Sequence, residues 1–119
     1  MKLIYDENST KDIVQNYYKT YEDIDGELTI AIGSRKVSSV GRFVVYQTIP
    51  TIEFRLKGSM EFAGKMHPVD IPLSEDEIRN VFITMAHSTG RNVKCISIDY
   101  NEEGFEHVTV EAFRKRKVK

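Results

Sequence analysis

The sequence predicts a single α+β domain in which two α-helices pack against an antiparallel-rich sheet of about five to seven strands. Three observations predict this class. Apolar and polar residues alternate along several segments, two other segments repeat apolar residues at helical spacing, and 119 residues leave room for one domain. The elements follow the order β-α-β-β-β-(β)-α-β-β. The domain should span residues 1–113, followed by a basic tail at 114–119.

The first strand is predicted at residues 1–5, and a helix follows it. Ser9 and Asp12 have the spacing of a capping box, and Asp25-Gly26 should end the helix. Tyr18 lies off the apolar stripe and is therefore a candidate surface anchor for a partner, because tyrosine combines a large contact area with a polar tip. The stripe that should face the core consists of Ile13, Val14, Tyr17, Tyr21 and Ile24.

Several β segments should follow the first helix. Residues 27–32 alternate, and residues 42–49 are apolar enough to predict a more fully buried strand. The segment between them, residues 33–41, is polar and flanked by glycine, so it is expected to be a loop or an irregular edge.

Residues 52–66 show the clearest alternation in the chain. Two arrangements keep the apolar residues on one face: a hairpin whose three-residue loop pairs Leu56 with Met60, or one long bent strand. A two-residue turn at Gly58-Ser59 would instead place an apolar residue opposite a charged one. The following tract, HPVDIP, contains two prolines and should be extended at a sheet edge or outside the sheet.

The second helix has strong start and stop signals. Ser74 and Glu77 form a capping box, and the acidic residues between them favour the positive end of the helix dipole. Gly90 should end the helix in a left-handed conformation. The buried stripe should consist of Ile78, Val81, Phe82 and Met85.

The C-terminal segment predicts a hairpin with Glu102-Glu103-Gly104 at its turn. On the other face, this register places Asp99 opposite His107. Such a pair can orient an imidazole that activates a nucleophile, but no serine or cysteine lies on an elbow motif, so we interpret it as an exposed cross-strand ion pair. The remaining expected pairs are Ile98 with Val108, Ile96 with Val110, Ser97 with Thr109, and Cys95 with Glu111.

The charge is distributed unevenly along the chain. The net charge is −1, yet residues 1–113 carry twelve basic and eighteen acidic side chains, and the last six residues hold five basic ones. The tail is a candidate for phosphate contacts, or else a solvated terminus that protects the last strand from aggregation. If the last strand continues, its basic groups should alternate between the two faces of the sheet. The candidate contact residues are Arg114, Lys115, Arg116 and Lys117.

No motif for a catalytic site, a cofactor or a metal ion occurs in the sequence. The three histidines lack the spacing of a zinc site, and the single cysteine, Cys95, makes a secreted disulfide scaffold unexpected. The chain shows no internal repeat, no signal-peptide core and no apolar stretch long enough for a membrane span, so we expect a cytoplasmic, soluble protein. The acidic cluster at Glu22, Asp23, Asp25 and Glu27 is interpreted as a solvated turn, with a cation site or a docking patch as alternatives.

These features predict a small non-enzymatic accessory or binding protein that acts through protein–protein contacts of its sheet or first helix. The partner is another protein or a second copy of the chain, because an open sheet has edges that a two-fold partner can cover. The alternative is a nucleic-acid-associated protein that uses the basic tail together with Arg91 or Arg35-Lys36. The sequence resembles no known family in its motifs.

Overall fold

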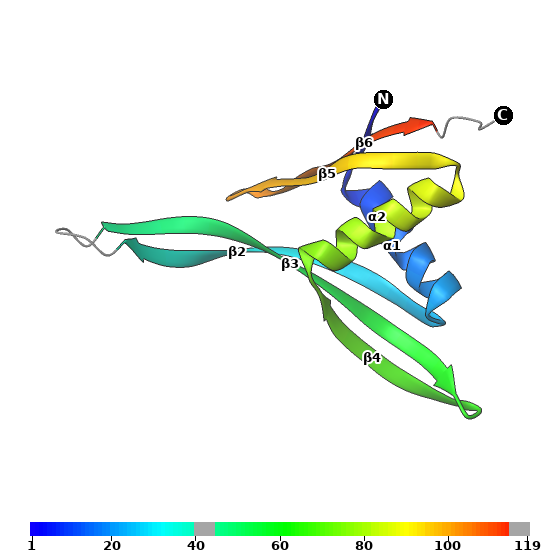
Figure 1. Cartoon of the computed structure of the whole chain (residues 1–119). Coiled ribbons are helices and arrows are strands. Elements are labelled where there is room, and N and C mark those ends of the chain that lie inside the picture. Colours follow the sequence, from blue (N-terminus) through cyan, green and yellow to red (C-terminus); the bar gives the residue numbers. More distant parts are fainter. Residues whose placement is uncertain (40–44, 115–119) are drawn as a thin grey trace.

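The structure is a computed structural model that describes residues 1–39 and 45–114. Within these residues the chain forms one α+β domain with two helices and six strands, divided between two antiparallel sheets of three strands each (Figure 1). The predicted fold class, strand number and order of elements are confirmed. The strands form two sheets, whereas the sequence suggested one.

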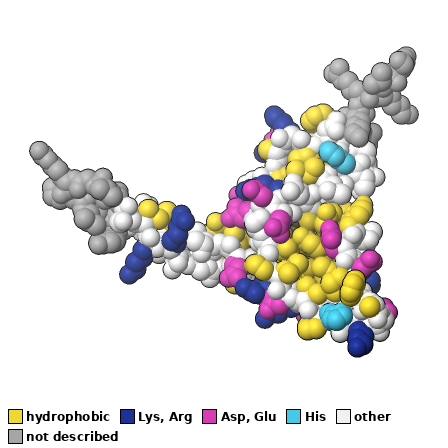
Figure 2. Space-filling model, turned by 60° about the horizontal axis from the view of Figure 1, so that its bottom comes forward, with side chains coloured by type: hydrophobic (Ala, Val, Ile, Leu, Met, Phe, Trp, Pro, Cys, Tyr) yellow, Lys and Arg dark blue, Asp and Glu magenta, His cyan; other side chains and the backbone are white. Residues whose placement is uncertain are grey.

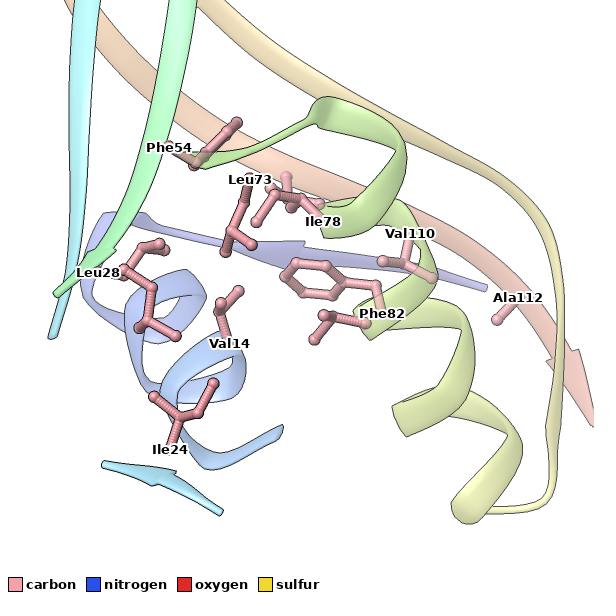
Figure 3. Packing of buried hydrophobic residues seen from close by; sticks show 12 residues of the cluster. Val14, Ile24, Leu28, Phe54, Leu73, Ile78, Phe82, Val110 and Ala112 are labelled. Atoms are coloured by element: carbon pink, nitrogen blue, oxygen red, sulfur yellow. The ribbon is translucent and has the colours of Figure 1, made fainter. Parts of the chain in front are cut away.

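The sheets have the strand orders β1-β6-β5 and β2-β3-β4, and the two helices lie between them (Figure 1). Side chains from both sheets and both helices meet in one core, in which Val14, Phe54 and Ile78 are fully buried (Figure 3). The elements are β1 (Lys2–Tyr5), α1 (Glu7–Tyr21), β2 (Ile24–Ser39), β3 (Val45–Phe62), β4 (Lys65–Leu73), α2 (Glu75–Ser88), β5 (Arg91–Asn101) and β6 (Gly104–Arg114).

Both helices start at a side-chain cap. For α2 this is Ser74, as predicted, whose hydroxyl accepts a hydrogen bond from the Glu77 backbone N–H at 3.1 Å. For α1 the cap is Asp6, whose carboxylate accepts from the Ser9 N–H at 2.8 Å. The predicted start at Ser9 is therefore wrong, because Asp6 provides an acceptor one turn earlier.

The ends of the helices agree less well with the sequence. Gly90 has a φ of 76°, as its predicted role requires. Helix α1, however, ends at Tyr21, before the predicted stop at Asp25-Gly26. Asp23 takes a φ of 55° in the turn to β2, and Asp25 and Gly26 already belong to that strand.

The chain consists of two βαββ units that exchange their first strands. The first unit is β1-α1-β2-β3 and the second is β4-α2-β5-β6, and β1 pairs with β6 while β4 pairs with β3. The N-caps of the two helices, Asp6 and Ser74, are 68 positions apart (74 − 6). The same offset relates the buried Val14 of α1 to the buried Phe82 of α2.

The strand registers show the same equivalence between the units. In each sheet, two buried residues of the central strand pair with an apolar residue on both sides, and these two rows are equivalent between the units. The equivalent rows are Leu28-Leu56-Ile71 with Ile96-Val110-Leu3, and Ile30-Phe54-Leu73 with Ile98-Val108-Tyr5.

The region between α1 and α2 departs from two predictions. Residues 33–39 continue strand β2 and do not form a loop, and Gln47, Thr48 and Ile49 of the expected buried strand are exposed. Residues 40–44, which complete these two predicted segments, lie outside the described residues.

The other two predictions for this region agree with the structure. The long-strand alternative for residues 52–66 is confirmed as far as Phe62, where Ala63 and Gly64 turn the chain with φ values of 53° and 76°. The hairpin alternative is wrong, because Leu56 pairs with Leu28 and Ile71 and not with Met60. The HPVDIP tract lies in β4, an edge strand, where a missing proline N–H is tolerated.

The C-terminal hairpin has the predicted register. Each of the four predicted cross-strand pairs is present, and so is the pairing of Asp99 with His107. Asn101 supports the turn, because its Oδ1 accepts hydrogen bonds from the backbone N–H groups of Glu103 and Gly104.

We expect Gly58→Ala to lower the free energy of unfolding by about 2 kcal/mol or more. Strands β2 and β3 approach closely where Gly26 pairs with Gly58, and a Cβ at Gly58 would overlap the carbonyl oxygen of Asp25 and the Cα of Gly26. Urea unfolding would measure the change. Gly33→Ala is the matched control on the same strand pair, since its Cβ would meet only the Thr51 hydroxyl, at 3.1 Å. Equal, small effects of the two substitutions would contradict the prediction.

Candidate functional site

The β2–β3 hairpin extends beyond the body of the protein as a two-stranded arm (Figure 1). We define the arm by residues 33–38 of β2 and 47–51 of β3. Strand β4 pairs with β3 only over Phe54–Phe62, so within the described residues of the arm β2 and β3 pair only with each other. The radius of gyration is 17.8 Å, whereas a compact domain of this length would have about 13.5 Å.

The arm has no counterpart in the second βαββ unit. Equivalent residues of β2 and β5 are 68 positions apart in the sequence (96 − 28), whereas equivalent residues of β3 and β6 are only 54 apart (110 − 56). The first hairpin is therefore 14 residues longer (68 − 54) than the second. The turn of the second hairpin, residues 101–104, corresponds to residues 33, 34, 49 and 50, so residues 35–48 form the extension.

The arm is cationic, and the rest of the chain, apart from the tail, is acidic. No acidic residue occurs between Glu27 and Glu53, while Arg35 and Lys36 are exposed. Figure 2 shows basic side chains on the arm. Residues 1–27 and 53–113 carry nine basic and eighteen acidic side chains. The arm therefore presents a positive surface on a negatively charged protein.

Each face of the arm carries a basic side chain beside an uncharged one. Because paired residues of antiparallel strands share a face, Arg35 lies beside Ile49, and Lys36 lies beside Thr48. Ile49 is 37% exposed, which is high for an isoleucine in a strand. At the base of the arm an open hollow of about 400 Å³ reaches the β5–β6 turn at Glu102.

The Asp99–His107 pair is the exposed cross-strand pair that the sequence predicts. The Nε2 atom of His107 lies 3.2 Å from Oδ2 of Asp99, and both side chains are more than one-third exposed. Ser97, two residues before Asp99 on the same strand, donates its hydroxyl to Oδ1 of Asp99 at 3.0 Å. Its hydroxyl therefore binds the carboxylate of the pair, whereas a nucleophile would have to face the imidazole.

Cys95 also lacks the surroundings of a reactive thiol. Its Sγ donates to Oε2 of Glu111 at 3.3 Å, and this hydrogen bond, followed by partial desolvation, raises the pKa of the thiol above its usual value. A raised pKa lowers the thiolate fraction, which is the nucleophilic form.

The basic tail is described only at its first residue. Arg114 is the last residue of β6, and its backbone pairs with that of Arg91. The predicted continuation of the strand is thus confirmed as far as Arg114. The other candidate contacts, Lys115, Arg116 and Lys117, lie outside the described residues.

Helix α1 places its tyrosines differently from the prediction. Tyr18, the expected surface anchor, is half-buried against the core, whereas Tyr21, expected in the core, is 54% exposed. The ring of Tyr17 lies between them, with centroids 5.2 Å from Tyr18 and 5.0 Å from Tyr21. Burial and, to a lesser extent, the negative charge of Glu77 raise the pKa of Tyr18 to about 12.

Two members of the acidic cluster, Asp23 and Asp25, line an open hollow of about 620 Å³ near the end of α1. Glu61 of β3 and Lys19 of α1 line the same hollow, whereas Glu22 and Glu27 do not. Among the residues that the structure describes, no group of three or more His, Cys, Asp or Glu side chains is arranged to hold a metal ion. In the same part of the chain, neither helix has the length and apolar character needed to cross a membrane.

Comparisons with known proteins give no relative: the chain matches no protein-family model, no curated protein and no solved structure. The arm is therefore the candidate site on structural grounds alone. Sequence reasoning missed it because glycine and serine in residues 33–41 indicated a loop. The available signal was the absence of acidic residues between Glu27 and Glu53.

We expect Tyr18 to ionise only at strongly alkaline pH. The folded protein favours the neutral phenol, so this contribution to stability is complete below the usual tyrosine pKa of 10.0 and is lost as the pH rises from there toward 12. Absorbance of tyrosinate during alkaline titration would follow it. Tyr18→Phe should remove the component that titrates toward pH 12, whereas Tyr21→Phe, the exposed control, should leave that component in place; the opposite result would contradict the assignment.

Removing the Asp99–His107 pair should change stability by no more than about 1 kcal/mol, because exposed ion pairs contribute little. Thermal unfolding of Asp99→Asn, His107→Gln and the double variant would give the coupling between the two side chains. Ser88→Ala, at the end of α2, serves as a surface control. A coupling well above this value would indicate that the pair has a role beyond a surface contact.

Proposed function

We propose that this chain is a non-enzymatic binding protein that uses the β2–β3 arm to hold an acidic surface of a partner protein. The observation that carries this proposal is the 14-residue extension of one hairpin relative to its counterpart. The second unit closes the same sheet with a short turn, so the fold itself does not need the extension.

Folding the arm without a partner is unfavourable in free energy. Ordering each residue costs about 1–2 kcal/mol, and a two-stranded ribbon alone recovers little of this by burial. Both strands of the arm also leave a backbone edge unpaired within the described residues, and such edges attract further strands. A partner that adds a strand to one edge, or covers Ile49, would supply the missing contacts.

Charge favours an acidic partner. Arg35 and Lys36 are exposed without an acidic neighbour on the arm, and complementary charge speeds association and selects among partners. The acidic body of a second copy has the same chemistry, so self-association through the arm is one form of this proposal.

A non-catalytic role is part of the proposal. Asp99 and His107 are paired with each other on an open surface, and the hydrogen bond from Cys95 to Glu111 raises the pKa of the thiol, which disfavours its nucleophilic form. We place the protein in the cytoplasm, because its single cysteine is unlike the disulfide scaffolds of small secreted domains.

Nucleic-acid binding is the second candidate function, and the shape of the arm favours it. A two-stranded ribbon fits the major groove of DNA, and Arg35, Lys36, Gln47 and Thr48 are residue types that contact bases and phosphates. The basic tail would add phosphate contacts. We rank this function below protein binding because the acidic body would repel a polyanion.

We expect an arm-shortened chain to lose its partner. This variant lacks residues 35–48 and replaces residues 33, 34, 49 and 50 with the Asn-Glu-Glu-Gly turn of the second hairpin. Affinity capture from cells would compare it with the wild-type chain, and the partner would then be purified and titrated calorimetrically. Nuclease treatment before capture tests whether a nucleic acid mediates the contact.

The charge requirement has its own matched pair of variants. Arg35→Gln with Lys36→Gln should weaken binding by about tenfold or more, because two charge contacts are lost. Lys57→Gln with Lys65→Gln makes the same charge change outside the arm and should leave the affinity within about twofold. Equal binding by the arm-shortened chain would overturn the proposal, and binding that nuclease abolishes would favour the second function.

A further inference from the structure

Helices α1 and α2 and the β1-β6-β5 sheet enclose a cavity of about 140 Å³ at the end of the domain away from the arm. Its walls are apolar over most of their area. They are contributed by Leu3, Tyr5, Ile13, Phe82, Met85 and Val110.

The equivalence of positions between the two units explains why this space is open. The cavity residues Met85 and Ala86 of α2 correspond to Tyr17 and Tyr18 of α1, at the same offset of 68 positions (86 − 18). In the first unit both tyrosine rings pack against the core. Ala86 has no atom beyond Cβ, so the equivalent volume in the second unit is not filled by the chain.

A positive charge lies at the same cavity. Arg91, the first residue of β5, lines the cavity and is half-buried, and it forms no ion pair with any side chain that the structure describes. No acidic residue lines the cavity. Thr89 also lines the cavity, but its hydroxyl already donates to the carbonyl of Ala86 at 2.9 Å. The guanidinium is the charged group in the lining that remains for a ligand.

We propose that this cavity binds a small apolar carboxylate, with the apolar part between the helices and the carboxylate on Arg91. A dry apolar cavity of about 150 Å³ accommodates benzene, so the volume here fits one aromatic ring or a branched chain of similar size. Arginine binds a carboxylate through two parallel hydrogen bonds, which orients the ligand with its charge outward. This site is independent of the arm and of the function proposed for it.

Benzoate is the probe that tests the site. In a titration of the full-length chain followed by NMR, benzoate should shift the signals of Met85 and Phe82 and bind with a Kd below about 1 mM, which is expected for a ligand of this size. Acetate has the charge without the ring and should produce no saturable shift. Failure of benzoate to saturate these signals would overturn the proposal.

Two variants separate the apolar part of the site from its charge. Ala86→Tyr places the equivalent side chain of the first unit in the cavity and should abolish benzoate binding, whereas Ala31→Tyr, on an exposed strand position, should not. Arg91→Gln should weaken benzoate binding about tenfold and leave the binding of benzene unchanged. Lys94→Gln, which removes an exposed charge from the same strand, should have no effect on either ligand.

The results distinguish the proposal from its alternatives. Benzoate binding that survives Ala86→Tyr in a folded protein places the ligand elsewhere and overturns the site. Equal loss of benzoate and benzene in Arg91→Gln overturns the role of the guanidinium. If Ala86→Tyr does not fold, the Met85 and Phe82 shifts in the wild-type chain still locate the ligand, and Arg91→Gln still tests the charge.

Discussion

Each sheet of this protein is completed by a strand from the other βαββ unit, and the rest of the structure depends on this exchange. Strand β1 pairs with β6, and β4 pairs with β3. A two-stranded hairpin is marginally stable alone, so neither unit can form a stable sheet without the other. Because β1 leads into α1 and β4 into α2, the exchange also fixes both helices between the sheets, where they share one core.

The sequence predicts well those elements that local chemistry determines. Ser74 starts α2. The turn at Asn101 sets the β5–β6 register, and the pairing of Asp99 with His107 follows from that register together with strand alternation. The exchange between units is not local. Among equivalent positions in residues 2–32 and 70–100, and in 51–60 and 105–114, only Glu7/Glu75 and Ile30/Ile98 are identical. Interchangeable apolar residues preserve the core without preserving a detectable repeat.

The candidate site was the least predictable part of the chain, and this also has a physical reason. A strand shows alternating apolar and polar residues when one of its faces is buried, whereas the arm contacts solvent on both faces. Without that alternation, Gly33, Ser34 and Ser38 indicated a loop, because glycine and serine are typical of loops. The predicted environments of Tyr18 and Tyr21 were wrong for a related reason. Helical spacing puts Tyr21 on the apolar stripe and Tyr18 off it, but the packing of α1 against α2 and β2 covers Tyr18 and leaves Tyr21 exposed.

The two features without an equivalent in the other unit, the arm and the cavity, are those that the fold can do without. The second unit closes its hairpin with a short turn, and the first unit fills the cavity position with Tyr18. Each feature has a cost. The arm leaves strand edges exposed, and a cavity of about 140 Å³ gives up about 3 kcal/mol of packing. Stability alone would favour removing both, so their presence argues that each of them binds something.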